Sequence, residues 1–205
     1  VITGNYIDNN FVEWTNEHSE SPEFGVQLSF GGLTLTGNIF TAIDVADWFN
    51  FIVVKPYGEG HFIHGLSVVS NVFRIINGSI DRVEHVDTTF ADLDYSRMRM
   101  VNFSGNTFHA VNEQVFNPAF LTHTQSATSN TWIADTEPYL PFKGRARFVD
   151  AMTADGAIQN GSGSEQFEMP WVESAYGTDK RQVRFVWDTA VSGSVRYQVR
   201  MDNPL

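Results

Sequence analysis

The sequence predicts an all-β fold in two parts, a stack of parallel strands followed by a small antiparallel module. Three observations predict it. A short motif, Gly or Ser followed by Asn, returns at nearly constant intervals along the first part of the chain. Val, Ile, Phe and Thr are frequent around the motif, which favours strands. Beyond residue 140, apolar residues alternate with polar ones between Gly/Ser turns, as in antiparallel strands.

The motif marks a repeat. Its asparagines are Asn5, Asn38, Asn71 and Asn106, so the steps are 33, 33 and 35 residues. The small residue before each Asn suits a bend. Apolar residues recur three positions before each Asn and two positions after it, namely Ile2, Leu35, Val68 and Phe103, then Ile7, Phe40, Phe73 and Phe108.

A repeat of this length is typical of a solenoid. Ankyrin units share the period but need a Thr-Pro-Leu-His signature that no copy has, and leucine-rich repeats are shorter. A parallel β-helix fits better, because like residues then form internal columns and the asparagines form a hydrogen-bonded ladder between rungs. We therefore expect residues 1–140 to be the end portion of a longer parallel β-helix.

The segments between the repeat motifs should leave the coil as loops. Within residues 44–65, the run "FIVV" predicts a further buried strand before a turn. The run "TTFADLDYSRM" (88–98) predicts a short helix, and the turn-like composition of 123–132 predicts the end of the coil.

Residues 141–205 predict a β-rich capping or trimerisation module. Its expected strands are 144–153, 181–190 and 192–202, with a turn at 160–165. Such a module would cover the open end of the stack, which otherwise exposes an unpaired edge.

Charge and composition exclude several classes of function. The net charge is −11, and residues 1–142 hold 16 Asp/Glu against 5 Lys/Arg, so a nucleic-acid partner is not expected. No run of eighteen apolar residues is present, so we expect no membrane insertion. The absence of cysteine excludes disulfides and thiol-ligated metals. The chain begins with Val and shows no signal segment, which fits a fragment or a processed chain.

Rungs marked by Gly-Asn-x-Phe and followed by a small β-rich module resemble the pectate-lyase-like right-handed β-helix superfamily. Within it, the phrases "EWTNEH", "VVKPYG" and "DRVEHVDTTFADLDY" are most similar to bacteriophage tailspikes and to the head spikes of gene transfer agents. The resemblance implies a homotrimer at a virion or particle surface, or outside the cell. It also implies host attachment, by binding or cleaving a cell-surface polysaccharide.

Polysaccharide sites on such scaffolds combine paired carboxylates with exposed aromatic rings. Glu13-Trp14 and Asp47-Trp48 follow their rung asparagines at similar distances, so we expect the two pairs to stack in adjacent rungs, with Glu13 and Asp47 as candidate catalytic acids. Alternatively, the two tryptophans line the core or a subunit contact, and the acids are merely solvated. The candidate carbohydrate-binding residues are Trp14, Glu17, His18, Trp48, Tyr57 and His61.

Two hypotheses of function follow. The first is a trimeric spike that binds surface polysaccharide, and the second is a glycoside hydrolase acting on capsular or exopolysaccharide. A lyase is less favoured, because an acidic face repels uronates unless calcium is supplied. His61 and His64 are three apart and would point to opposite faces of a strand, so we expect no metal site and no cofactor.

Overall fold

The structure is a computed structural model that describes residues 1–15 and 29–203, and strands account for 56% of it. The chain divides into two compact units, Val1–Asn117 with Asp202–Leu205, and Pro118–Met201. The boundary falls before the expected position at residue 140, because the strand that follows Asn117 pairs within the second unit. Within the described ranges, no helix is long and apolar enough to cross a membrane.

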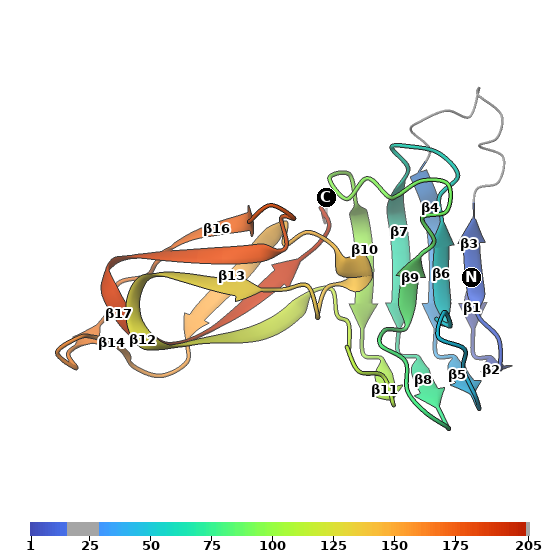
Figure 1. Ribbon diagram of the computed structural model, residues 1–205, viewed down its shortest axis with the longest axis horizontal. Coiled ribbons are helices and arrows are strands. Elements are labelled where there is room, and N and C mark those ends of the chain that lie inside the picture. The colour runs from blue at the N-terminus through green and yellow to red at the C-terminus, as the bar shows by residue number, and fades with distance from the viewer. Residues whose placement is uncertain (16–28, 204–205) are drawn as a thin grey trace. The chain divides into compact units, whose positions relative to one another are not determined.

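The first unit contains three parallel sheets, whose strands run side by side in Figure 1. Each of the first three repeats adds one strand to each sheet, and the fourth adds a strand to the first two sheets only. The first sheet is β1 (Ile2–Thr3), β4 (Ser29–Thr36), β7 (Phe62–Val69) and β10 (Arg99–Ser104). The second is β2 (Tyr6–Asp8), β5 (Ile39–Ala42), β8 (Val72–Ile75) and β11 (Thr107–His109). The third is β3 (Val12–Thr15), β6 (Ile52–Lys55) and β9 (Glu84–Val86).

The predicted apolar columns are confirmed by the strand register. Each apolar position three residues before a rung Asn pairs with its counterpart in the next repeat, as Leu35 does with Val68. The column after the bend is aromatic, and the Phe40 and Phe73 rings stack with centroids 5.1 Å apart. Phe73 and Phe108 continue the stack at 5.8 Å. Burying these side chains stabilises the unit by roughly 1.5–3 kcal/mol for each fully covered residue.

The predicted asparagine ladder is also present. The side-chain oxygen of Asn38 accepts hydrogen bonds from the backbone N–H and the side-chain amide of Asn5, at 3.0 and 3.1 Å. Asn71 does the same for Asn38 at 3.0 and 2.9 Å, and Asn106 for Asn71 at 2.9 and 3.1 Å. The residue before each Asn has a positive φ, which is easy for glycine but is carried by Ser70 in the third copy. The small residue of the motif is therefore required by the backbone at the bend.

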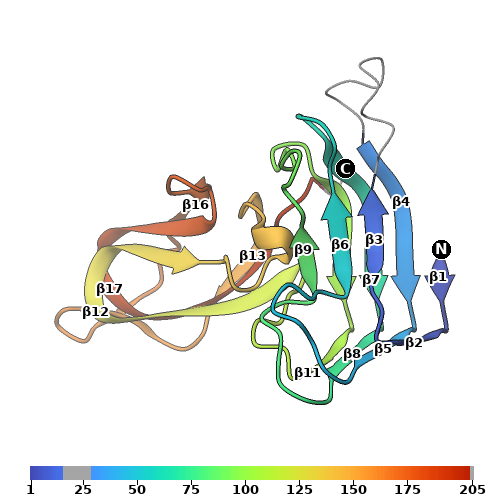
Figure 2. The ribbon, with the colours of Figure 1, turned by 45° about the vertical axis from the view of Figure 1, so that its right-hand side comes forward.

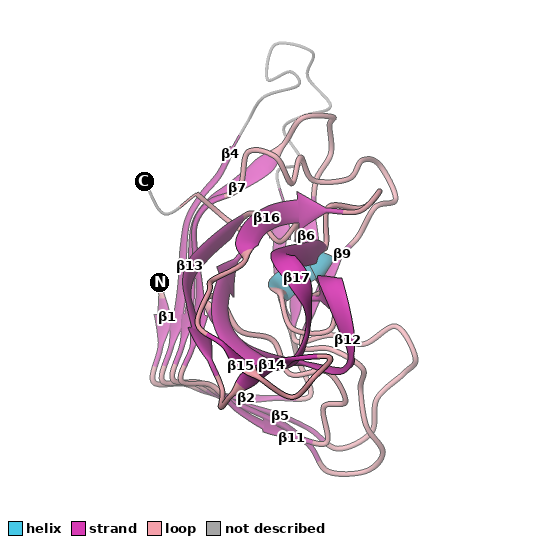
Figure 3. Cartoon of the chain, turned by 90° about the vertical axis from the view of Figure 1, so that its left-hand side faces the viewer, coloured by secondary structure: helices cyan, strands magenta, loops and turns pink. Residues whose placement is uncertain are grey.

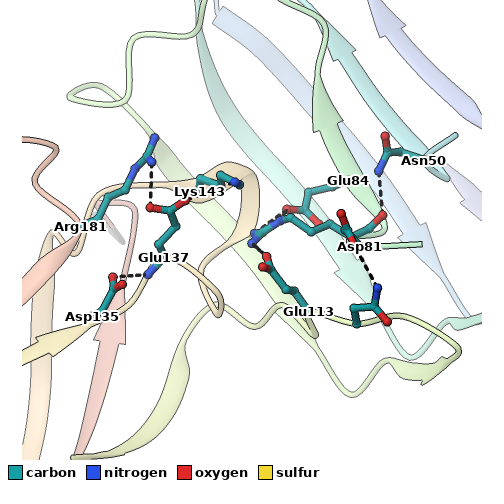
Figure 4. A network of polar contacts seen from close by, with 10 residues as sticks. Asn50, Asp81, Glu84, Glu113, Asp135, Glu137, Lys143 and Arg181 are labelled. Atoms are coloured by element: carbon teal, nitrogen blue, oxygen red, sulfur yellow. Dashed lines mark hydrogen bonds and ion pairs between the residues drawn. The ribbon is translucent and has the colours of Figure 1, made fainter. Parts of the chain in front are cut away.

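A charged network occupies part of the interior near the last repeat, as Figure 4 shows for its acidic members. Glu84 lies in register with Ile52 and takes an inward position that is apolar in the preceding strands. Its carboxylate binds Arg82 at 2.8 Å, and Arg82 also binds Glu113 at 2.7 Å. Asn50 donates to the backbone oxygen of Arg82 at 2.7 Å. Buried charges require such partners, because either one alone would be costly to desolvate.

The second unit is antiparallel and is organised around one long strand, β17 (Gln182–Arg200). β17 pairs with β12 (Ala119–Asp135) from Gln182 to Val199, with register shifts near its middle. Its other neighbours are β13 (Phe148–Ala154), β14 (Ile158–Asn160) and β16 (Trp171–Tyr176), while β15 (Glu165–Gln166) pairs with β14. The 3₁₀ turn η3 (Pro141–Lys143) follows β12. Figure 3 shows that the strands of this unit curl strongly.

Three local predictions are wrong. Residues 123–132 are not the end of the coil but the middle of β12, whose polar residues face outward between inward ones such as Trp132. The separate strands expected at 181–190 and 192–202 are one strand, β17, which passes through Gly193 without a break. Residues 88–98 form bends and turns instead of a helix. By contrast, the buried strand predicted from "FIVV" is present as β6.

Candidate functional site

The outer face of the β3–β6–β9 sheet gathers the acidic, basic and aromatic groups that make it the candidate site, and this sheet faces forward in Figure 2. Residues alternate across the sheet, so Trp14, Val54 and Val86 share one inward row. Glu13, Val53 and His85 form an outward row. The next outward row is Thr15 and Lys55, continued by Asp87 directly after β9. We call Glu13, Lys55, Tyr57, Asp87 and Phe90 the outer-face site.

Lys55 and Asp87 form the charged centre of the outer-face site. The Lys55 ammonium lies 3.3 Å from a carboxylate oxygen of Asp87. This hydrogen bond raises the pKa of Lys55, and the negative charges of Asp87 and Glu13 act in the same direction. The pKa of Asp87 is lowered, first by the hydroxyl and backbone N–H of Thr89 and then by Lys55. Both groups are therefore charged at neutral pH.

Two aromatic rings stand beside this charged pair. Tyr57 and Phe90 stack with their centroids 4.4 Å apart and their planes 19° from parallel. The Lys55 ammonium lies 5.8 Å from the Tyr57 centroid and 5.5 Å from that of Phe90, within reach of a cation–π interaction. Phe90 is 56% exposed, so one ring of the pair offers an apolar surface to solvent. Exposed aromatic rings held in a fixed orientation suit stacking on a flat apolar ligand face.

The expected stacking of the two acid–Trp pairs is wrong. Glu13 pairs in register with Val53, and Trp14 with Val54, whereas Asp47 and Trp48 lie in the turn before β6. The two pairs follow their asparagines at similar distances, but the turn displaces the second pair out of the strand. Glu13 and Asp47 are consequently not neighbours in the sheet. Both carboxylates are exposed, as solvated acids are.

The two tryptophans have different environments. Trp14 takes an inward position, and its ring meets that of buried Phe30 edge to face with centroids 5.2 Å apart. This agrees with the alternative that Trp14 lines the core. Trp48 is 69% exposed and rests against Phe11 and Phe49, with centroids 6.2 and 6.3 Å away. Trp48 is thus an exposed ring supported from below.

The other predicted residues divide between surface, core and undescribed chain. Tyr57 belongs to the outer-face site. His61 is fully buried beside Phe30, so it offers no surface to a glycan. Glu17 and His18 lie outside the described residues. Among the residues that the structure does describe, no group of His, Asp and Glu is arranged to hold a metal ion.

Sequence reasoning missed Lys55 and Phe90 as members of the site and did not place Asp87 beside Lys55. Lys55 lies beside Thr15 in the sheet but 40 residues after it in the sequence, and Asp87 comes 32 residues after Lys55. Neither separation equals the spacing of the asparagines. The available signal was the alternation of β6, in which Lys55 is the polar residue that ends a buried run. Aligning the third strand of each repeat independently would have placed the three outward positions together.

No protein-family model matches the chain, and no curated protein or solved structure is significantly similar to it.

Proposed function

We propose that the chain is part of a homotrimeric spike or fibre that binds a bacterial cell-surface polysaccharide through the outer-face site. We further infer that the first unit is the end portion of a right-handed parallel β-helix. Its three parallel sheets and its Asn ladder support a coil, because each of the first three repeats contributes one strand to each sheet and the fourth contributes a strand to two of them. Right-handedness follows from the general rule that about 98% of connections between parallel strands of a sheet take that hand.

The observation that carries the proposed binding is the Tyr57–Phe90 ring pair beside Lys55 and Asp87. A pyranose ring presents an apolar face of C–H groups and a rim of hydroxyls. Phe90 offers a flat exposed surface for the C–H face of the sugar. Glu13 and Asp87 offer hydrogen-bond acceptors for its hydroxyls. Glu13 and Lys55 lie on strands, and the Phe90 ring is held by its stacking on Tyr57, so little side-chain freedom is lost when a ligand binds.

The charge of the outer-face site favours a neutral glycan. Lys55 is its only cation among the described residues of the site, and Asp87 already holds it at 3.3 Å. Glu13 adds a second, exposed carboxylate. An anionic sugar would therefore meet net negative charge, whereas a neutral sugar can accept from Lys55 and donate to the carboxylates.

The sequence resemblance supports four parts of the proposal: the spike, the trimer, the location at a particle surface and the role in host attachment. The Gly-Asn-x-Phe rungs and the β-rich second part carry it. An acidic chain whose repeats form a stacked scaffold suits an exposed, elongated attachment protein.

We do not extend the proposal to hydrolysis. Glycoside hydrolysis by two carboxylates requires them to flank one bond, at roughly 5–9.5 Å from each other. Glu13 stands on β3, while Asp47 lies in the turn before β6 and out of register with it. The described residues thus supply acceptors for binding more readily than a catalytic pair.

The binding proposal is tested with immobilised capsular or exopolysaccharide from candidate host bacteria. The variant Tyr57→Ala/Phe90→Ala removes the ring pair, and Tyr6→Ala is the matched control, because Tyr6 is 64% exposed on a strand of another sheet. Since an aromatic contact contributes about 0.5–1.5 kcal/mol, we expect the double variant to bind about tenfold more weakly or worse. Equal binding by the two variants, with unchanged melting temperatures, would remove the outer-face site from the proposal.

Two further measurements separate the remaining parts. New reducing ends after incubation, lost in Glu13→Gln, would replace pure binding with hydrolysis. Light scattering of the intact chain at micromolar concentration should give about three times the 23.1 kDa chain mass. A monomer mass would contradict the trimer but would leave the binding proposal unaffected.

A further inference from the structure

The second unit contains a polar pocket that is separate from the outer-face site. It has a volume of about 380 Å³ and is lined by residues of β12, of β17 and of the turn after β12. The residues that matter for its chemistry are Phe120, His123, Asp135, Tyr139 and Tyr197. None of the described residues that line it is a lysine or an arginine.

The pocket exists because the β12–β17 pair bends. The register shifts between Gln125 and Ser129 and again between Ser129 and Thr131. Such irregularities bend a strand and increase its twist. The two halves of β12 therefore both reach the pocket, the first through His123 and the second through Asp135.

Tyr197 is the most deeply placed polar residue of the pocket. It is 4% exposed, and its ring packs edge to face on Phe185 with centroids 5.3 Å apart. The residue lines the pocket together with Tyr139 and Asp135. The pKa of the Tyr197 hydroxyl is raised by burial first and then by the nearby Tyr139 and Asp135. A neutral hydroxyl in the wall of a polar pocket can hydrogen-bond a ligand that enters it.

His123 completes the floor. Its ring lies 6.0 Å from Trp132 and 6.2 Å from Phe185, and its Nε2 atom is buried without a hydrogen-bond partner in the described chain. Burial lowers its pKa, partly offset by a hydrogen bond from its side chain to Gln125. The imidazole is therefore neutral near pH 7, and because its one N–H is engaged by Gln125, Nε2 is left as a hydrogen-bond acceptor.

The turn that carries Asp135 and Tyr139 is held rigidly. Asp135 accepts a hydrogen bond from the Glu137 backbone N–H at 3.0 Å. Figure 4 shows the Glu137 carboxylate between Lys143 and Arg181, at 3.2 and 3.1 Å. Both nearby cations are thus engaged by Glu137. The polar groups are consequently fixed before any ligand arrives.

We propose that this pocket binds one uncharged or amine-bearing sugar unit. Asp135, Tyr139, Tyr197 and His123 supply acceptors and donors for several hydroxyls, and Phe120, which is 77% exposed at the rim, supplies a ring for stacking. Because Asp135 is the only charged lining side chain among the described residues, an anionic sugar is disfavoured. The volume of about 380 Å³ lies at the lower end of the range for small-molecule pockets and accommodates one sugar ring. This site lies in a different unit and does not depend on the outer-face proposal.

The test uses saturation-transfer NMR on the intact chain with D-glucose, D-galactose, D-mannose, D-glucosamine and D-glucuronate as probes. Tyr197→Phe deletes only the buried hydroxyl, and Tyr176→Phe is the matched control on β16, outside the pocket. Losing one neutral hydrogen bond should weaken binding of the preferred sugar about two- to tenfold in Tyr197→Phe and leave it unchanged in Tyr176→Phe. Asp135→Asn keeps the acceptor for the Glu137 N–H and should weaken binding about tenfold or more.

Three results would overturn the proposal: no transfer to any probe up to about 50 mM, stronger binding of D-glucuronate than of the neutral sugars, or equal effects of Tyr197→Phe and Tyr176→Phe. The variant Tyr57→Ala/Phe90→Ala should leave the monosaccharide signal unchanged. Whether this variant still binds polysaccharide tests the outer-face site and not the pocket.

Discussion

Replacing Asn71 by Ala removes the central member of the asparagine ladder. Asn71 is 1% exposed and accepts from the backbone N–H and the side-chain amide of Asn38. It also donates to the backbone oxygen of Leu35 at 2.9 Å and to the side-chain oxygen of Asn106 at 3.1 Å. The substitution therefore breaks contacts to the repeats on both sides.

The loss can be estimated contact by contact. The buried N–H of Asn38 loses its acceptor, which costs about 1–3 kcal/mol because water cannot replace it. The side-chain amide of Asn38 is affected less, because it also donates to the backbone oxygen of Ile2 at 3.0 Å. Loss of the Leu35 contact adds about 1 kcal/mol. We expect the free energy of unfolding of the first unit to fall by about 2–4 kcal/mol.

Urea unfolding followed by circular dichroism measures this loss, and hydrogen exchange of residues 33–42 assigns the transition to the first unit. With a urea dependence near 2 kcal/mol per molar, the midpoint should fall by about 1–2 M. Asn77→Ala is the control, since Asn77 is exposed and its side chain contacts Asp44 at 3.2 Å, so its effect should stay within about 0.5 kcal/mol. If Asn71→Ala behaves like Asn77→Ala, the apolar columns hold the repeats together and the ladder argument fails.

Three other outcomes are expected. Arg82→Met leaves Glu84 buried without its cation and should lower the free energy of unfolding by about 3–5 kcal/mol in urea titrations. The double variant Arg82→Met/Glu84→Leu should recover most of this loss, and no recovery would contradict the pairing. Because the folded state lowers the pKa of Asp87, its contribution to stability is present above the ordinary value of 3.8 and is lost as the pH falls below it. Asp87→Asn should therefore flatten the acid side of the stability profile and, by NMR titration, lower the pKa of Lys55; an unchanged Lys55 pKa would refute the pairing. Ser70→Gly relieves a φ of 55° and should raise the melting temperature, with a stabilisation of about 0.5–1 kcal/mol, and a lower melting temperature would argue against strain at this bend.

The repeats were predictable because their spacing repeats. Leu35 pairs with Val68, and Phe40 with Phe73, at the same step as Asn38 and Asn71. Apolar burial and the amide ladder act in successive repeats, so the same residue types recur there. A constant period in the sequence therefore corresponds to a constant register between strands.

The candidate site was predictable only in part, because it lies between the repeated positions. Glu13 and Tyr57 were identified as candidates, but Lys55 and Phe90 were not. The connections before β6 and β9 differ in length, so counting from the rung asparagines placed Asp47 beside Glu13 when Val53 stands there. Loop length, which the core does not constrain, decides what the outer face carries.

The second unit shows the same limit for a different reason. Its antiparallel character followed from alternation, yet β12 was missed because many of its exposed residues are Ser and Thr and its register shifts near Ser129. The convergence of His123, Asp135 and Tyr197 on one pocket depends on that bend. The spacing of these residues along the chain does not predict that they meet.

By itself, the sequence determined the all-β class, the positions of the rung asparagines and the apolar columns of the first unit, because local period and burial impose them directly. Only the tertiary structure decided which charged and aromatic side chains meet. Trp14 faces the core and Trp48 faces solvent although both follow an acid, since one lies on a strand and the other in a turn. Neighbours across strands are set by register and bends, and these depend on the packing of the whole unit.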